Sequence, residues 1–96
     1  MNKRVTDKLN QNVRKALHIA KAKAITIEGF SQFSYTLDWH DFPGSLRVTC
    51  HFESSQLLQE FLNNHRESHL IKLLQHDFLK VGIKFRDVSK NIRFAI

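Results

Sequence analysis

The first quarter of the chain has the apolar spacing of an amphipathic helix. At about 100° per residue, apolar and basic residues separate onto opposite sides of such a helix. The apolar side collects Val5, Leu9, Val13, Ala16, Leu17, Ala20 and Ala24, and the basic side collects Arg4, Lys8, Arg14, Lys15, His18 and Lys21. The pattern predicts a helix over about residues 5–27 that buries one side and exposes a basic side to solvent.

From residue 33 onward the apolar period changes to two, which is typical of strands with one buried face. The alternating apolar residues are Phe33, Tyr35, Leu37 and Trp39, and then Leu46, Val48, Cys50 and Phe52. A Pro-Gly pair at residues 43–44 separates the two runs and favours a turn. We therefore expect an antiparallel hairpin whose apolar side is covered by helices and whose other side is polar.

Two further apolar runs, over residues 57–62 and 70–81, predict two helices. On one continuous helix their apolar sides would point about half a turn apart, so we expect a break within residues 63–68. Ser54 or Ser55 would cap the first helix and Ser68 the second. Alternating residues at 83–86 and 92–96 then predict one or two further strands.

These elements follow in the order α-β-β-α-α-β(-β). They predict an α+β fold of two layers, in which helices cover one face of an antiparallel sheet of three or four strands. Ninety-six residues suffice for one modest hydrophobic core, so we expect a single domain over residues 1–96.

The net charge of +6 lies entirely in the first quarter of the chain, which contains most of the predicted first helix. Residues 1–23 hold seven basic side chains and one acidic one, whereas residues 24–96 hold eight of each. Such a basic helix beside a neutral body is typical of proteins with polyanionic partners. The candidate nucleic-acid contacts are Arg4, Lys8, Arg14, Lys15 and Lys21. Alternatively, the helix is only a solvated surface, and the protein is a protein–protein adaptor or a homodimer that pairs through its last strand.

Three segments carry a resemblance to a known group of proteins: Gly29-Phe30, the stretch from Asp41 to Leu46, and the stretch from Gly82 to Lys90. Together with the basic first helix, they resemble small bacterial proteins of about this length that carry the label Fis family transcriptional regulator. The resemblance implies a DNA-associated regulator. The C-terminal third lacks the two-helix pattern of the Fis helix-turn-helix, so it assigns no DNA-contacting residue.

The order strand, Ser-Ser-capped helix, second helix and Ile-Arg-Phe strand is also similar to the KH-like domain of some bacterial helicase-associated proteins. KH domains grip nucleic acid with a Gly-x-x-Gly loop between their two helices. That tetrapeptide does not occur in this sequence.

Catalytic and metal-binding patterns are not recognisable. On one unbroken helix His65, His69 and His76 would share a face suited to zinc or nickel, but the expected break separates them. Cys50 lies in an apolar row, where a thiol is usually inert. We therefore expect no enzyme, no metal, no cofactor and no small-molecule substrate.

The sequence also bears on where the protein is located and on the role of its aromatic residues. A lone cysteine and the lack of a long apolar run favour a cytoplasmic protein without a membrane partner. Phe33, Tyr35 and Trp39 suit either a base-stacking platform or the core, and the apolar helices that need a packing surface favour the core.

Overall fold

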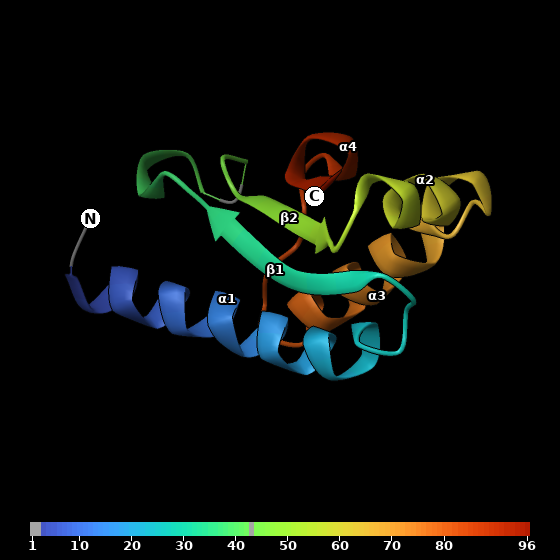
Figure 1. The fold of residues 1–96 in the computed structure, drawn as a ribbon. Coiled ribbons are helices and arrows are strands. Elements are labelled where there is room, and N and C mark those ends of the chain that lie inside the picture. Colours follow the sequence, from blue (N-terminus) through green and yellow to red (C-terminus); the bar gives the residue numbers. More distant parts are fainter. Residues whose placement is uncertain (1–2, 43) are drawn as a thin grey trace.

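The computed structural model describes residues 3–42 and 44–96, with side chains described for residues 6–38, 40–42 and 44–96. Its fold is α+β, as predicted (Figure 1). The elements are α1 (Lys3–Ala24), β1 (Phe30–Thr36), the short 3-10 helix η1 (Trp39–Asp41), β2 (Arg47–Phe52), α2 (Ser55–Asn63), α3 (Glu67–Leu79), α4 (Val88–Asn91) and β3 (Ile92–Ala95).

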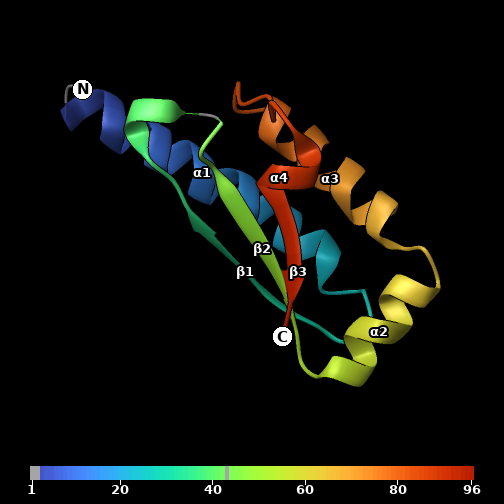
Figure 2. The same cartoon turned by 90° about the horizontal axis from the view of Figure 1, so that it is seen from above.

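The strands form one sheet in the order β1-β2-β3, and its two faces differ. Helices α1 and α3 both lie beneath it, whereas α2 and α4 lie near its ends (Figures 1 and 2). On the helix side, β2 buries Val48, Cys50 and Phe52. On the other side it presents Arg47 and Thr49, so the uncovered face is polar and the predicted single helical layer is confirmed.

The hairpin of β1 and β2 is antiparallel, as predicted, but β1 is shifted along the sequence. A bulge between Phe30 and Gln32 lets Phe30 face the core in addition to Phe33, which period-two spacing alone does not show. The strand ends at Thr36 instead of Trp39, because Asp38 caps η1 by accepting a hydrogen bond from the His40 amide at 2.9 Å.

The third strand corrects the prediction of a purely antiparallel sheet. β3 pairs with β2 in parallel, with Val48 opposite Ile92 and Cys50 opposite Phe94. The sheet is therefore mixed. The physical reason is the crossover through α2 and α3, which returns the chain to the starting end of β2 before β3 begins.

Residues 83–86 are not a strand, although they alternate as one. Ile83 and Phe85 are buried, and the Phe85 ring lies 4.9 Å from that of Phe78. The alternation therefore shows that every second side chain of this segment is buried in the core, although the segment does not pair with the sheet. The chain then turns into α4, where Asp87 caps the helix by accepting from the Ser89 amide at 3.1 Å.

The predicted break between the two central helices is confirmed. His65 adopts a left-handed φ of 55° between α2 and α3. Ser54 caps α2, but Ser68 does not cap α3, because α3 already begins at Glu67. At the far end of α3, Gly82 adopts φ 79° and Ile83 donates to the Phe78 carbonyl at 2.9 Å, which closes the helix as a Schellman motif.

Helix α1 ends at Ala24, slightly before the predicted residue 27, and buries small side chains against the rest of the core. Val13, Ala16 and Ala20 are fully buried. Among the described residues, no helix combines the length and the apolar character needed to cross a membrane.

Candidate nucleic-acid interface

Four cationic side chains lie along the solvent side of α1, and we call them the basic ridge: Lys8, Arg14, Lys15 and Lys21. All four are exposed, because the opposite side of the helix packs into the core. Thirteen residues separate the first from the last, which corresponds to about 20 Å along the helix axis. The side chain of Arg4, the fifth residue predicted from the sequence, lies outside the described side chains.

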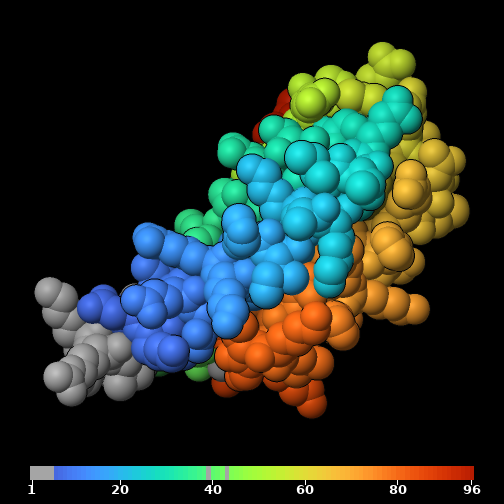
Figure 3. Space-filling view, turned by 90° about the horizontal axis from the view of Figure 1, so that it is seen from below, coloured from blue at the N-terminus to red at the C-terminus, as the bar shows by residue number. Residues whose placement is uncertain are grey.

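No residue of the basic ridge forms an ion pair in the described part of the chain, although the exposed Asp7 directly precedes Lys8 on the same helix. Its helix holds no aspartate or glutamate after Asp7. The ion pairs among described residues involve Lys23, Lys80, His76 and Arg86, and none involves a ridge residue. Viewed from below, the blue-to-cyan surface of α1 runs openly across the molecule beside the orange end of α3 (Figure 3). Among the described residues, the ridge cations are therefore not paired with carboxylates.

Lys23 lies on the same helix but has a different role. Its Nζ atom lies 2.9 Å from Oδ1 of Asp77 on α3, and the Asp77 side chain is fully buried. Lys80 approaches the same oxygen at 3.9 Å. This pair joins α1 to α3, so it fixes the orientation in which α1 presents the basic ridge.

A groove of about 220 Å³ runs between one flank of α1 and strand β1. Two ridge residues, Arg14 and Lys21, line it from the helix, and Phe33 and Tyr35 line it from the strand. Both aromatic rings are half-buried and pack against the core, and the Tyr35 hydroxyl donates a hydrogen bond to the Asn10 side chain. As predicted, both residues contribute to the core, but both are only partly buried and also line the groove. Trp39, the third aromatic residue of the predicted row, has no described side chain.

A second, larger hollow of about 420 Å³ forms where two distant segments meet. Three cations, Arg47, Arg86 and Lys90, line it together with two carboxylates. One of these carboxylates, Asp41, lies 3.7 Å from Arg86. Most of its lining residues come from two of the three segments noted in the sequence for their resemblance, over residues 41–46 and 82–90. The sequence spacing gave no indication that these two segments lie together.

Buried Asn91 holds this second hollow together. Its side-chain nitrogen donates to the Leu46 carbonyl at 2.7 Å, and its oxygen accepts from the Asp87 amide at 2.9 Å. A fully buried amide with partners on both sides fixes the turn before β2 against the turn before α4. The mixed charges of the hollow make it a weaker candidate for a polyanion than the basic ridge.

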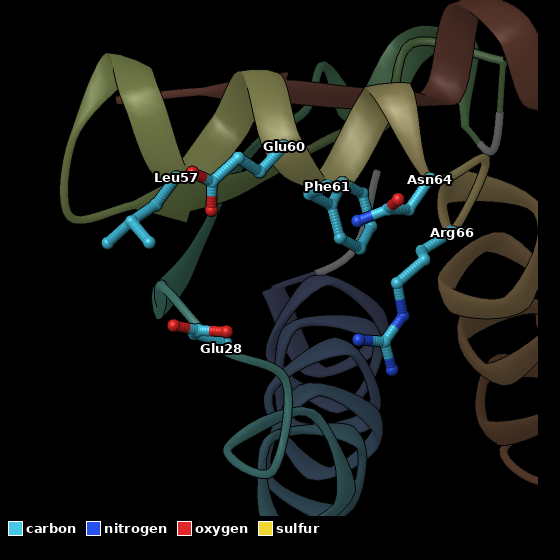
Figure 4. Close-up of a pocket in the computed structure, with 6 residues that line it drawn as sticks. All are labelled: Glu28, Leu57, Glu60, Phe61, Asn64 and Arg66. Atoms are coloured by element: carbon cyan, nitrogen blue, oxygen red, sulfur yellow. The ribbon is translucent and has the colours of Figure 1, made fainter.

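A third hollow, of about 40 Å³, lies at the end of α2. Figure 4 shows Glu28 and Glu60 on one side of it and Asn64 and Arg66 on the other. Two acids and one base give this surface a local charge of −1. It does not suit a phosphate-rich ligand.

The histidines and the cysteine do not form a site among the described residues. No group of three or more histidine, cysteine, aspartate or glutamate side chains there is arranged to hold a metal ion. His69 and His76 lie on α3, but His65 lies in the break before it. Burial raises the pKa of Cys50 to about 12, so its thiol stays protonated at neutral pH and is a poor nucleophile.

Comparisons of the chain with protein families, with curated proteins and with solved structures found no match.

Proposed function

We propose that this protein is a non-enzymatic nucleic-acid-binding protein that contacts phosphate groups through the basic ridge. The observation that carries the proposal is the set of four exposed cations on α1 without a carboxylate partner among the described residues. Lysine and arginine side chains placed in this way release counterions from nucleic acid when they bind. This role agrees with the DNA-associated regulator that the family resemblance implies.

The geometry favours a contact spread along a strand over a single phosphate site. The ridge extends over about 20 Å, and its cations alternate with small and polar residues rather than converging on one point. Phosphate contacts of this kind supply affinity and position but little sequence information. We therefore expect binding with low sequence preference.

Salt dependence tests the proposal. If four cations each neutralise one phosphate of a single strand, the affinity falls about 50-fold between 50 and 200 mM salt. The measurement is fluorescence anisotropy of a labelled oligonucleotide titrated with the protein at several salt concentrations. A salt-independent signal, or no binding at low salt, contradicts the proposal.

A charge-matched pair of variants separates the ridge from net charge. The ridge variant carries Arg14→Glu, Lys15→Glu and Lys21→Glu, and we expect it to lose at least tenfold in affinity. The control variant carries Lys72→Glu, Lys84→Glu and Arg93→Glu, which change the charge by the same amount at three exposed residues outside α1. An equal loss in both variants would show that only the overall charge matters.

The second candidate function is that of a protein–protein adaptor or homodimer, and the free edge of the sheet is the observation that favours it. β3 is an edge strand, and Ile96 just beyond it is 64% exposed. Light scattering at micromolar concentration distinguishes the two functions. A dimer that persists in the ridge variant, combined with no oligonucleotide binding by the wild-type protein, supports the adaptor or homodimer.

A further inference from the structure

The groove between α1 and β1 combines two kinds of side chain that the basic ridge alone does not offer. Arg14 and Lys21 stand two helical turns apart on one wall, about 10.5 Å along the axis. Phe33 and Tyr35 form the opposite wall, two residues apart on the same face of an edge strand. The groove thus has positive charge on one side and flat apolar rings on the other.

The aromatic wall is held in place before any ligand arrives. Phe33 packs against Phe30 with ring centres 4.8 Å apart, and Tyr35 is fixed through its hydroxyl to Asn10. Because the core already orders these rings, the two side chains lose little conformational entropy when a ligand stacks on them.

The ligand that fits both walls is anionic and carries flat rings. Bases stack on aromatic side chains with little sequence preference, and the neighbouring phosphates bind cations. A duplex does not offer this combination, because its bases are already stacked and paired within the helix. Gln32, at the same groove, adds an amide that can bond a base edge.

We propose that the α1–β1 groove takes an unpaired base of a single-stranded nucleic acid, whose flanking phosphates lie on Arg14 and Lys21. This inference rests on the proposed function and narrows it from polyanion binding in general to single strands. The basic ridge supplies the salt-dependent part of the affinity, and the aromatic wall supplies the preference for single strands over duplexes.

The experiment compares aromatic variants on matched probes. Labelled oligothymidylate and oligouridylate of about 12 nucleotides represent DNA and RNA single strands. A duplex of the same length represents paired DNA. The variants are Phe33→Leu and Tyr35→Leu, with Phe94→Leu as control, because Phe94 is a similarly half-buried aromatic residue that packs on Phe61 away from the groove. Circular dichroism verifies that each variant is folded.

We expect Phe33→Leu and Tyr35→Leu each to weaken single-strand binding by about tenfold. Duplex binding and the salt slope stay within about twofold, because neither variant removes a cation. Phe94→Leu binds both probes as the wild type does. A preference for one of the two single strands shows whether the groove favours the DNA or the RNA probe, and either preference supports the inference.

Three outcomes would overturn the inference, and they differ from failure of the proposed function. The groove is excluded as a binding site for an unpaired base if the aromatic variants bind single strands as tightly as the wild type does. It is also excluded if these variants lose duplex binding to the same extent as single-strand binding, or if Phe94→Leu weakens single-strand binding as much as they do. In each case salt-dependent binding through the ridge still stands. Failure of the wild-type protein to bind any of the probes at low salt instead removes the proposed function itself.

Discussion

Replacement of Lys23 by methionine tests what holds α1 in position. The Nζ atom of Lys23 lies 2.9 Å from Oδ1 of Asp77, whose side chain is fully buried while that of Lys23 is 44% exposed. The second carboxylate oxygen, Oδ2, has no hydrogen-bond partner among the described residues. Lys23→Met keeps the aliphatic part of the side chain and removes only the charge, so it isolates the electrostatic contribution of this pair.

The magnitude follows from the distance and the burial. At an effective dielectric constant of about 20, two unit charges 2.9 Å apart attract by about 6 kcal/mol. Solvent screening at the 44% exposed Lys23 side chain and the desolvation cost of its ammonium group, which the variant no longer incurs, oppose this by several kcal/mol. Lys80 remains 3.9 Å from the same oxygen and offsets part of the loss. We therefore expect Lys23→Met to lower the free energy of unfolding by about 2–3 kcal/mol. This is at or below the lower limit of about 3 kcal/mol for breaking a fully buried pair, because Lys23 is partly solvated.

The assay is urea denaturation followed by far-ultraviolet circular dichroism, within a double-mutant cycle. In the Asp77→Leu background the carboxylate is gone, so Lys23→Met should cost almost nothing, and the coupling free energy should be at least about 1.5 kcal/mol. Lys72→Met is the control, because Lys72 is an exposed lysine on α3 without an ion pair among the described residues, and it should change stability by less than about 0.5 kcal/mol. Additive effects in the cycle, or a Lys23→Met variant as stable as the control, would refute the reasoning.

Two further predictions concern backbone strain and pH. Gly29 has φ 85°, and a Cβ there would lie 2.6 Å from Cβ of Leu57, whereas Gly82 has φ 79° with open space around it. Gly82→Ala should therefore lower the free energy of unfolding by about 1 kcal/mol through backbone strain alone. Gly29→Ala adds the steric clash and should lower it by at least about 2 kcal/mol. Urea denaturation measures both values, and equal losses would contradict the steric argument. The hydrogen bond from the Ser89 side chain, with help from the nearby Lys90 charge, lowers the pKa of Asp87 below its ordinary value of 3.8. The ionised Asp87 side chain therefore stabilises the fold at pH values above its pKa in the unfolded chain, and this stabilisation is lost as the pH falls through its pKa in the folded protein. An NMR titration should show the lowered pKa of Asp87, and Ser89→Ala should move that pKa back toward 3.8.

The candidate interface was only partly accessible from the sequence. Helical spacing predicted that Lys8, Arg14, Lys15 and Lys21 share the exposed side of one helix, and the described part of the chain confirms that placement. Helical spacing did not predict that Lys23 forms an ion pair with Asp77, because the two residues are 54 positions apart in the sequence. Helical spacing also gave no indication that α1 lies along β1 and forms a groove with it.

Most helices and strands could be predicted from the sequence because their patterns depend on local geometry, and the wrong predictions also have a local physical cause. Alternation and 3.6-residue spacing report which side of a segment is buried, so the helices and the hairpin could be predicted. The same signal at residues 83–86 reports burial without strand pairing, because an extended segment can cover a core without hydrogen bonds to a sheet. At Phe30 the alternation fails, because a bulge inserts one residue and reverses the side-chain direction.

The sequence by itself therefore determined the class of fold, the amphipathic basic helix and the place of the helix break, all of which depend on neighbours within a few residues. The tertiary structure decided the parallel direction of β3, the partner of Lys23 and the aromatic wall beside the ridge. These depend on how separate elements approach in space, and that is set by the packing of the common core, which no local spacing records.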